Sequence, residues 1–235
     1  MDTSLIEFAY PRHFVSQNQS TMTFNPLIFT DDYLRVRAVP TCHTSTYVFC
    51  HGKGQHGGDW QFMVEPLRKL GHCNHIAFIF PYLDYTEPGS GNSASKNTAL
   101  IQKIVHQEIA NGCDPDRIAV GGYNEGLDVA LTATLSDNQK IQGILGVTDR
   151  LGLTDDITGL AKPANARTPV FVLDRSQKEN NAGEKLLAAI EQPIGAFICG
   201  SQSDSSDGKP LTSEEIHVLD TFIYRSLPVE IGARN

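Results

Sequence analysis

The sequence predicts an α/β fold with a mostly parallel central sheet that is covered by helices on both faces. From residue 45 onward, short apolar runs typical of strands alternate with segments whose apolar residues have helical spacing. The expected strands are apolar at nearly every position, which indicates a sheet buried on both sides. Two loop-like stretches, 82–95 and 201–209, follow strand ends, where open α/β sheets bind their ligands.

The elements follow in order along the chain. The predicted strands are 46–50, 75–81, 117–122, 141–147, 169–174 and 195–200. The predicted helices are 59–70, 93–110, 125–135, 182–190 and 213–227, with Asp59 as the cap of the first and Asn111-Gly112 closing the second. Residues 1–44 are harder to interpret, and the stretch 21–39 is expected to add one or two antiparallel strands at the sheet edge. No internal linker divides the chain, so residues 1–235 are expected to form a single domain.

Composition excludes several classes of function. The chain has 235 residues, a formal net charge of −8 and no long Lys/Arg run, so nucleic acid and anionic membrane surfaces are poor partners. No apolar stretch approaches the roughly 20 residues of a membrane-spanning helix. The N-terminus shows no secretion signal. The 5 cysteines are irregularly spaced and are expected to be reduced thiols in the cytoplasm.

No cofactor and no metal are expected. The histidines form no HExxH or H-x-H pattern. His72 and His75 lie close to Cys73, which is compatible with a metal site, but a surface turn after a helix is the preferred interpretation.

The segment RIAVGGYNEGLDVALTATL carries the most information. A strand runs into Gly122-Tyr123-Asn124-Glu125-Gly126 and then into a helix. This is the setting of a nucleophile elbow, G-x-S-x-G, in which a tight turn between small residues exposes the central side chain above the sheet. Here the central residue is Asn124. The pattern alone is weak, because glycine-rich turns of this kind also bind phosphates.

Several motifs together resemble the acyl-protein thioesterase/carboxylesterase branch of the α/β-hydrolases, over roughly residues 45–227. VFCHGKGQHGGDW (48–60) is similar to that family's H-G-x-G loop, and NGCDPDRIAVGGYNEG (111–126) resembles its elbow segment. FIFPYLD, TPVFVL and LTSEEIHVLDTFI match further stretches in the right order. The resemblance implies the α/β-hydrolase fold.

The departures from the family pattern fall on its catalytic triad. Asn124 stands at the serine position, and the stretch 208–216 puts Lys209 where the family has its histidine. Ungapped alignment puts Lys178 at the acid, with Asp174 and Glu179 nearby. An amide is not a useful nucleophile, and without histidine no proton shuttle works at neutral pH. Loss of the nucleophile or base alone costs roughly 10⁶ in rate in a serine protease, so ordinary serine hydrolysis is not expected.

The resemblance also implies an oxyanion hole made by backbone N–H groups at Glu125 and Lys53, which does not need a serine. The sequence leaves open whether the Glu125 carboxylate faces solvent or the cleft. The expected catalytic groups are Asn124, Lys209, Asp174, Glu125 and Lys53, and the expected substrate-binding groups are His56, Tyr123, Tyr82 and Asp84.

Each of these residues also has a structural alternative. The sequence is equally consistent with Lys209 in solvent and with Lys209 in the cleft. Asp174, at a strand end, can simply cap a turn. His51 is expected to hold loop backbone, and His56 to lie at the cleft rim. Trp60 and Phe62 are expected to wedge the first helix against the sheet.

Three functions remain open from the sequence. The preferred one is a non-hydrolytic enzyme that isomerises, cyclises or forms C–C bonds in a small carbonyl-bearing, ester or polyketide-like ligand, with Lys209 moving protons. The second is a catalytically silent pseudo-hydrolase that binds a ligand or a partner. The third is an esterase or thioesterase with relocated residues, such as Ser201, Ser203 or Ser205. A homodimer is left open, because no residue specifies an interface.

Overall fold

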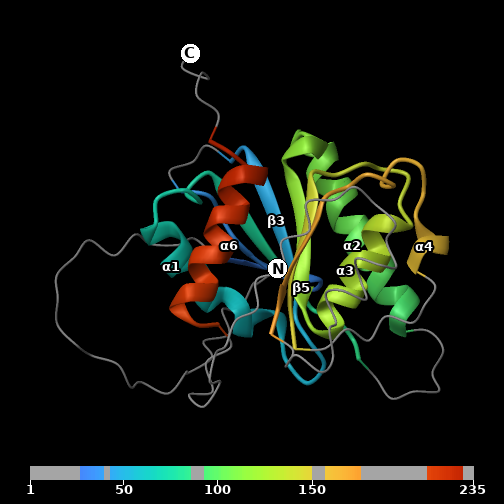
Figure 1. The fold of residues 1–235 in the computed structure, drawn as a ribbon, viewed down its shortest axis with the longest axis horizontal. Helices are drawn as coiled ribbons and strands as arrows, with labels where there is room; N and C mark the ends of the chain where they lie inside the picture. The colour runs from blue at the N-terminus through green and yellow to red at the C-terminus, as the bar shows by residue number, and fades with distance from the viewer. Residues whose placement is uncertain (1–26, 40–42, 86–92, 150–156, 176–210, 230–235) are drawn as a thin grey trace, which may run out of the picture.

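The computed structural model describes residues 27–39, 43–85, 93–149, 157–175 and 211–229. Seven strands of this part form one sheet in the order β1-β2-β4-β3-β5-β6-β7 (Figure 1). Their bounds are β1 (Leu27–Phe29), β2 (Tyr33–Val36), β3 (Ser45–Cys50), β4 (Ile76–Pro81), β5 (Ile118–Tyr123), β6 (Gly143–Thr148) and β7 (Val170–Asp174). The α/β-hydrolase prediction is confirmed, with a mostly parallel sheet between helices.

Strands β3 to β7 are parallel, whereas β1 and β2 are antiparallel additions at one edge. The edge strands predicted within 21–39 therefore form, although only residues from 27 onward are described. The register pairs Cys50 with Gly122 and Thr148 with Asp174. Since the paired strands run in the same direction, the ends of β3, β5, β6 and β7 meet at one edge of the sheet.

The helices form a layer on each face of the sheet, with α1 and α6 on one side and α2 and α3 on the other (Figure 1). One layer contains η1 (Gly57–Met63), α1 (Val64–Lys69) and α6 (Ser213–Ser226), and the other contains α2 (Ser93–Ala110) and α3 (Glu125–Leu135). The short elements η2 (Pro115–Arg117) and α4 (Ile157–Leu160) complete the described helices.

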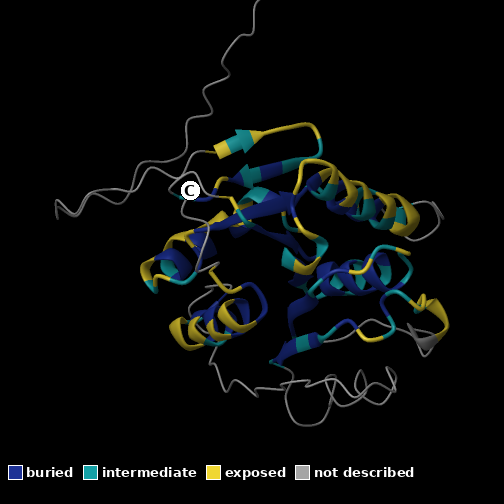
Figure 2. Ribbon diagram, turned by 90° about the horizontal axis from the view of Figure 1, so that it is seen from above, coloured by how far each residue is buried: buried dark blue, intermediate teal, exposed yellow. Residues whose placement is uncertain are grey.

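Alternation along the strands explains the two layers. Tyr47 and Phe49 of β3 belong to the core cluster that contains Trp60 and Phe222. Val48 lies in the opposite cluster, together with the apolar residues of α2 and α3. Because successive strand side chains point to opposite faces, a strand buried on both sides must be apolar throughout. Figure 2 shows the buried strands between helices whose exposed residues face outward.

The predicted start of the first helix is corrected by the structure. His56, not Asp59, is the N-cap of η1, and its ring accepts a hydrogen bond from the Gly58 N–H. Asp59 lies three residues later and its carboxylate accepts from the His56 N–H, which completes a capping box. Trp60 is buried against Phe49 as predicted, whereas Phe62 is 36% exposed and does not wedge the helix.

Some predictions lie outside the described residues. These are the helix 182–190, the strand 195–200, Lys178, Glu179, Lys209 and the serines 201, 203 and 205. The single-domain assignment of residues 1–235 stays a prediction. Within the described ranges, no helix has the length and apolar character required to cross a membrane.

Candidate functional site

Asn124 lies at the apex of a tight turn between β5 and α3, as the elbow prediction requires. Its backbone has φ 49° and ψ −117°, and among the described residues it is the only non-glycine with positive φ. A Cβ at Gly122 would lie 2.7 Å from the Cys50 carbonyl oxygen, and one at Gly126 would lie 2.2 Å from it. Both glycines are therefore required by the close approach of β3 to the turn. Asn124 therefore has a strained backbone conformation of the kind that clusters at functional sites.

The side chain of Asn124 is held by the end of β6. Its Oδ1 accepts hydrogen bonds from the Asp149 backbone N–H at 2.8 Å and from the Thr148 hydroxyl at 3.2 Å. Its Nδ2 lies 3.4 Å from Asp149 Oδ2. The amide is thus fixed above the sheet edge, and it offers neither a nucleophilic oxygen nor a titrating proton.

Asp149 is a site residue that sequence reasoning missed. Its carboxylate accepts a hydrogen bond from the Tyr123 hydroxyl, and its Oδ1 lies 3.4 Å from Arg175 Nε. The side chain is 43% exposed, so this carboxylate faces solvent beside the elbow. The available signal was its position two residues beyond the predicted strand 141–147, at the same sheet edge as Asn124.

Behind Asp149 lies a buried ion pair. Arg175 Nε is 3.1 Å from Glu215 Oε1, and the two side chains are only 6% and 1% exposed. Arg175 follows β7 and Glu215 lies in the first turn of α6. The pair therefore joins α6 to the elbow region through Asp149.

Tyr123 packs on the tryptophan of η1, with its ring centroid 5.1 Å from that of Trp60. Burial raises the pKa of Tyr123 to about 12, and the hydrogen bond to Asp149 acts in the same direction. At neutral pH the hydroxyl therefore keeps its proton and serves as a donor. Tyr123, expected as a substrate-binding group, is thus held by its packing on Trp60 and by its bond to Asp149.

Glu125 and Lys53 are brought together, but not as the resemblance implies. The backbone N–H of Lys53 donates to Glu125 Oε2 at 3.1 Å. The Glu125 carboxylate therefore faces the loop after β3, where the sequence left its direction open. One of the two implied oxyanion donors is thus already engaged by a side chain of the same protein.

The other predicted catalytic residues and Asp84 lie in different settings. Asp174 ends β7, is 6% exposed and pairs in register with Thr148, which itself bonds to Asn124. Lys209 lies outside the described residues, so its predicted partnership with Asn124 stays untested. Asp84 is exposed, and its backbone N–H and carbonyl both bond to the Asn97 side chain.

His56 and Tyr82 stack with ring centroids 4.6 Å apart, which builds an aromatic rim near the loop after β3. His51 has both ring nitrogens engaged. Nδ1 lies 2.9 Å from the Gly52 carbonyl oxygen, and Nε2 accepts from the Leu83 N–H at 3.0 Å. This arrangement requires a neutral ring with the proton on Nδ1. Burial lowers the pKa of His51, and the residue holds loop backbone as predicted.

Nothing in the described part of the chain gathers three or more side chains suited to hold a metal ion. His72 instead pairs with Asp220, with Nδ1 and Oδ2 2.7 Å apart. His75 is buried and its Nε2 bonds to the Leu227 carbonyl, so it is not part of an exposed turn.

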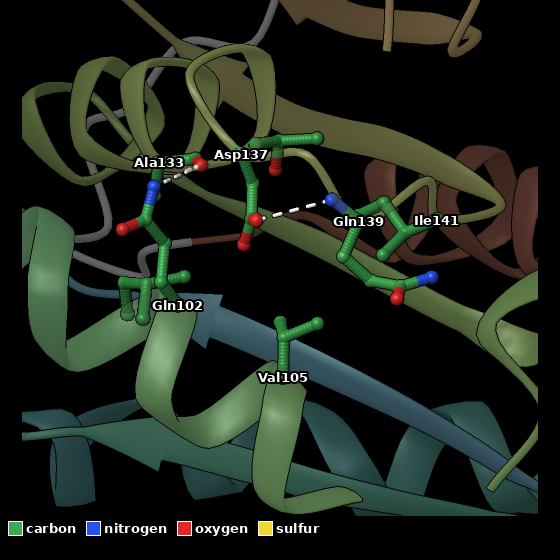
Figure 3. Close-up of a pocket in the computed structure, with 8 residues that line it drawn as sticks. Gln102, Val105, Ala133, Asp137, Gln139 and Ile141 are labelled. Carbon is green, nitrogen blue, oxygen red and sulfur yellow. Dashed lines mark hydrogen bonds between the residues drawn. The ribbon is translucent and has the colours of Figure 1, made fainter. Parts of the chain in front are cut away.

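A small pocket lies between α2 and α3, away from the elbow (Figure 3). Gln102 donates to the Ala133 carbonyl oxygen at 3.0 Å, and the Gln139 N–H donates to Asp137 at 3.1 Å. Residue 133 lies eight positions after the start of α3, which corresponds to about 12 Å along the helix axis. The pocket therefore does not belong to the elbow site.

The comparisons with known proteins agree with this fold. Residues 83–174 match the family model described as phospholipase/carboxylesterase. The chain is 28% identical over 217 residues to an acyl-protein thioesterase 1 of Gibberella zeae, covering 79% of this chain and 92% of that protein. It is also 28% identical over 153 residues to an acyl-protein thioesterase 1 of Yarrowia lipolytica, covering 55% of this chain and 67% of that protein.

The family-model match and these relatives support the resemblance to the phospholipase/carboxylesterase family of α/β-hydrolases. Solved structures of Arabidopsis thaliana SOBER1 and of a Dyadobacter fermentans phospholipase/carboxylesterase share the fold of this chain, each with a TM-score of 0.61 and 16% identity. The match to SOBER1 covers 78% of this chain and 99% of that protein. The match to the Dyadobacter fermentans protein covers 83% of this chain and 96% of that protein.

The matched relatives overturn the preferred function. The expectation of an enzyme for isomerisation, cyclisation or C–C bond formation is wrong, because the matched relatives are named thioesterases, which are hydrolases. A replaced triad does not by itself specify a new reaction, because function depends on the groups present in the site rather than on those that are missing.

Proposed function

We propose that this protein binds neutral acyl esters or thioesters at the elbow, the ligand class implied by its thioesterase relatives, without forming an acyl-enzyme. The observation that carries the proposal is the bonding of Asn124. Its amide occupies the apex where the family pattern has serine, and Asp149 and Thr148 hold it in place. A fixed amide offers a hydrogen-bonding surface to a carbonyl ligand but no group that attacks it.

The surroundings of the elbow support binding of an apolar acyl chain. Next to the apex, the ring of Tyr123 packs at a tilt on Trp60, and Phe62, which also contacts Trp60, is 36% exposed. The stacked pair of His56 and Tyr82 adds a further aromatic surface beside the loop after β3. Ligand sites typically combine such apolar walls with a few polar groups that fix orientation.

The proposal is tested by separating binding from turnover. Methyl octanoate and the octanoyl thioester of N-acetylcysteamine are titrated against the protein while the fluorescence of Trp60, the single tryptophan, is recorded. We expect saturable binding of both compounds. We expect thiol release from the thioester at the rate of a protein-free blank. Absence of binding by fluorescence and by calorimetry rules the function out.

A second candidate is hydrolysis by relocated residues. The names of the relatives favour it, and the 43% exposed carboxylate of Asp149 beside Asn124 is the group suited to accept a proton from an attacking water. Ser201, Ser203 and Ser205, the alternative nucleophiles, lie outside the described residues.

Two measurements identify this candidate. Labelling by a fluorophosphonate that maps to one of the three serines indicates a relocated nucleophile. Thiol release without labelling indicates direct attack by water, provided that the release is lost in the Asp149→Asn variant. If neither labelling nor release is observed, the binding function is favoured.

We also propose a cytoplasmic location. Cys50, Cys73 and Cys113 are free and buried, and burial raises the pKa of all three thiols. Reduced structural thiols are typical of reducing compartments. Fractionation of cells that express the tagged full chain tests this location.

A further inference from the structure

The loop after β3 already binds an anion in this structure, and that anion is the side chain of Glu125. The Lys53 N–H donates to Glu125 Oε2 at 3.1 Å across 72 residues of sequence. Glu125 directly follows the elbow apex, so the contact is made beside Asn124. Any ligand oxygen that approaches the Lys53 N–H must compete with this carboxylate.

The Glu125 carboxylate lies close against the loop after β3, which is itself internally bonded. A Cβ at Gly52 would lie 3.3 Å from Glu125 Oε2, so the carboxylate packs against the loop backbone. The Gly52 N–H donates to Gln55 Oε1 at 3.0 Å, and the Trp60 indole donates to the same oxygen at 3.1 Å. Glu125 also opens α3, where the helix dipole favours a negative charge.

A second carboxylate flanks the apex from the opposite side. The strand order β3-β5-β6 puts the end of β5, and with it Asn124, between the loop that contacts Glu125 and Asp149 at the end of β6. Within the described residues, Asp149 pairs with Arg175, which is shared with Glu215. The apex is therefore bordered by the carboxylates of Glu125 and Asp149.

We propose that Glu125 determines the charge selectivity of the elbow site, which accepts neutral acyl esters and thioesters and discriminates against the corresponding carboxylate anions. This inference rests on the proposed function. A neutral carbonyl competes for the Lys53 N–H without electrostatic repulsion. A free carboxylate needs the same donor and meets the charges of Glu125 and Asp149.

The test compares methyl octanoate with octanoate, using Trp60 fluorescence and calorimetry at neutral pH. We expect the wild-type protein to bind the ester about tenfold more tightly, the ratio expected from repulsion between partly solvated charges. Glu125→Gln keeps an acceptor oxygen but removes the charge, so the ratio should fall to about threefold or less, chiefly through tighter octanoate binding. Glu125→Ala removes the side chain that accepts from the Lys53 N–H, so this variant should give the tightest octanoate binding.

The matched control is Glu65→Gln, which removes the same charge from an exposed position on α1, where Glu65 pairs with Lys69. It should keep the wild-type ratio. If Glu65→Gln lowers the ratio as much as Glu125→Gln, net charge is responsible and the proposal is overturned. If Glu125→Gln leaves the ratio unchanged while both ligands bind, Glu125 is not the selectivity residue and the proposed function stands.

The backbone amide resonance of Lys53 gives an independent readout. We expect Glu125→Gln to shift it in the free protein, and methyl octanoate to shift it on binding. Saturable ester binding that leaves this resonance unchanged contradicts direct competition for the donor. Failure of both ligands to bind any variant removes the proposed function together with this inference.

Discussion

The side-chain oxygen of Asn124 accepts a hydrogen bond from the backbone N–H of Asp149 at 2.8 Å, so the apex of the elbow is fastened to the end of the neighbouring strand. The bond ties the residue at the nucleophile position to the backbone of Asp149, an acidic residue that the sequence pattern did not single out. We expect the stability of the turn to depend on this bond.

Restoring serine alone should not restore an esterase. Asn124→Ser supplies a hydroxyl, but both ring nitrogens of His51 are engaged and the Lys53 N–H is occupied by Glu125. Hydrolysis of p-nitrophenyl butyrate should stay within about tenfold of the wild-type protein, since a hydroxyl without a base contributes little. A burst of p-nitrophenol with one equivalent of acylated Ser at position 124 contradicts this.

The strain at the apex can be measured with two substitutions. Asn124→Ala loses the bonds to Asp149 and Thr148 but keeps a Cβ at φ 49°, so we expect a loss of about 1–3 kcal/mol in the free energy of unfolding. Asn124→Gly loses the same bonds and relieves the strain, and should be about 1 kcal/mol more stable than the alanine variant. Urea unfolding of both variants tests this order, and equal midpoints argue against strain.

The buried pair of Arg175 and Glu215 should be costly to break. Glu215→Ala leaves the guanidinium without this partner in a nearly dry environment, and removing one member of a buried pair typically costs about 3–5 kcal/mol. It also removes the capping-box bond to the Thr212 N–H. Denaturant unfolding should show a much larger loss than for Glu214→Ala, which is exposed in the same turn. Similar losses for both variants would mean that the pair contributes little.

Stability should decrease on mild acidification. Burial lowers the pKa of His43 and His51 below the ordinary value of 6.5. Below about pH 6.5 the unfolded chain therefore binds more protons than the folded chain. The contribution of these two histidines to the free energy of unfolding is present at higher pH, and it is lost as the pH falls toward their folded pKa. Urea midpoints measured from pH 7.5 to pH 5 should fall, and the fall should be shallower in His51→Gln than in His217→Gln, which is exposed. If the urea midpoints of the two variants fall equally steeply with pH, His51 is not a source of the pH dependence.

The sequence by itself determined the fold. Runs such as IAFIFP have no polar position, which is possible only where both sheet faces are covered, and helix α3 begins and ends where its spacing predicts. The glycines at 122 and 126 specified the elbow, because no other residue fits against the Cys50 carbonyl oxygen. These properties depend on local pattern and on close backbone contact.

Tertiary structure alone decided which groups surround Asn124. Asp149, Arg175 and Glu215 come from three separate elements, and Glu125 reaches Lys53 across 72 residues. Sequence periodicity reports which face of an element is buried, but not which side chains of different elements meet at the sheet edge. That depends on strand order, register and side-chain direction, so the charge of the site became visible only in the folded chain.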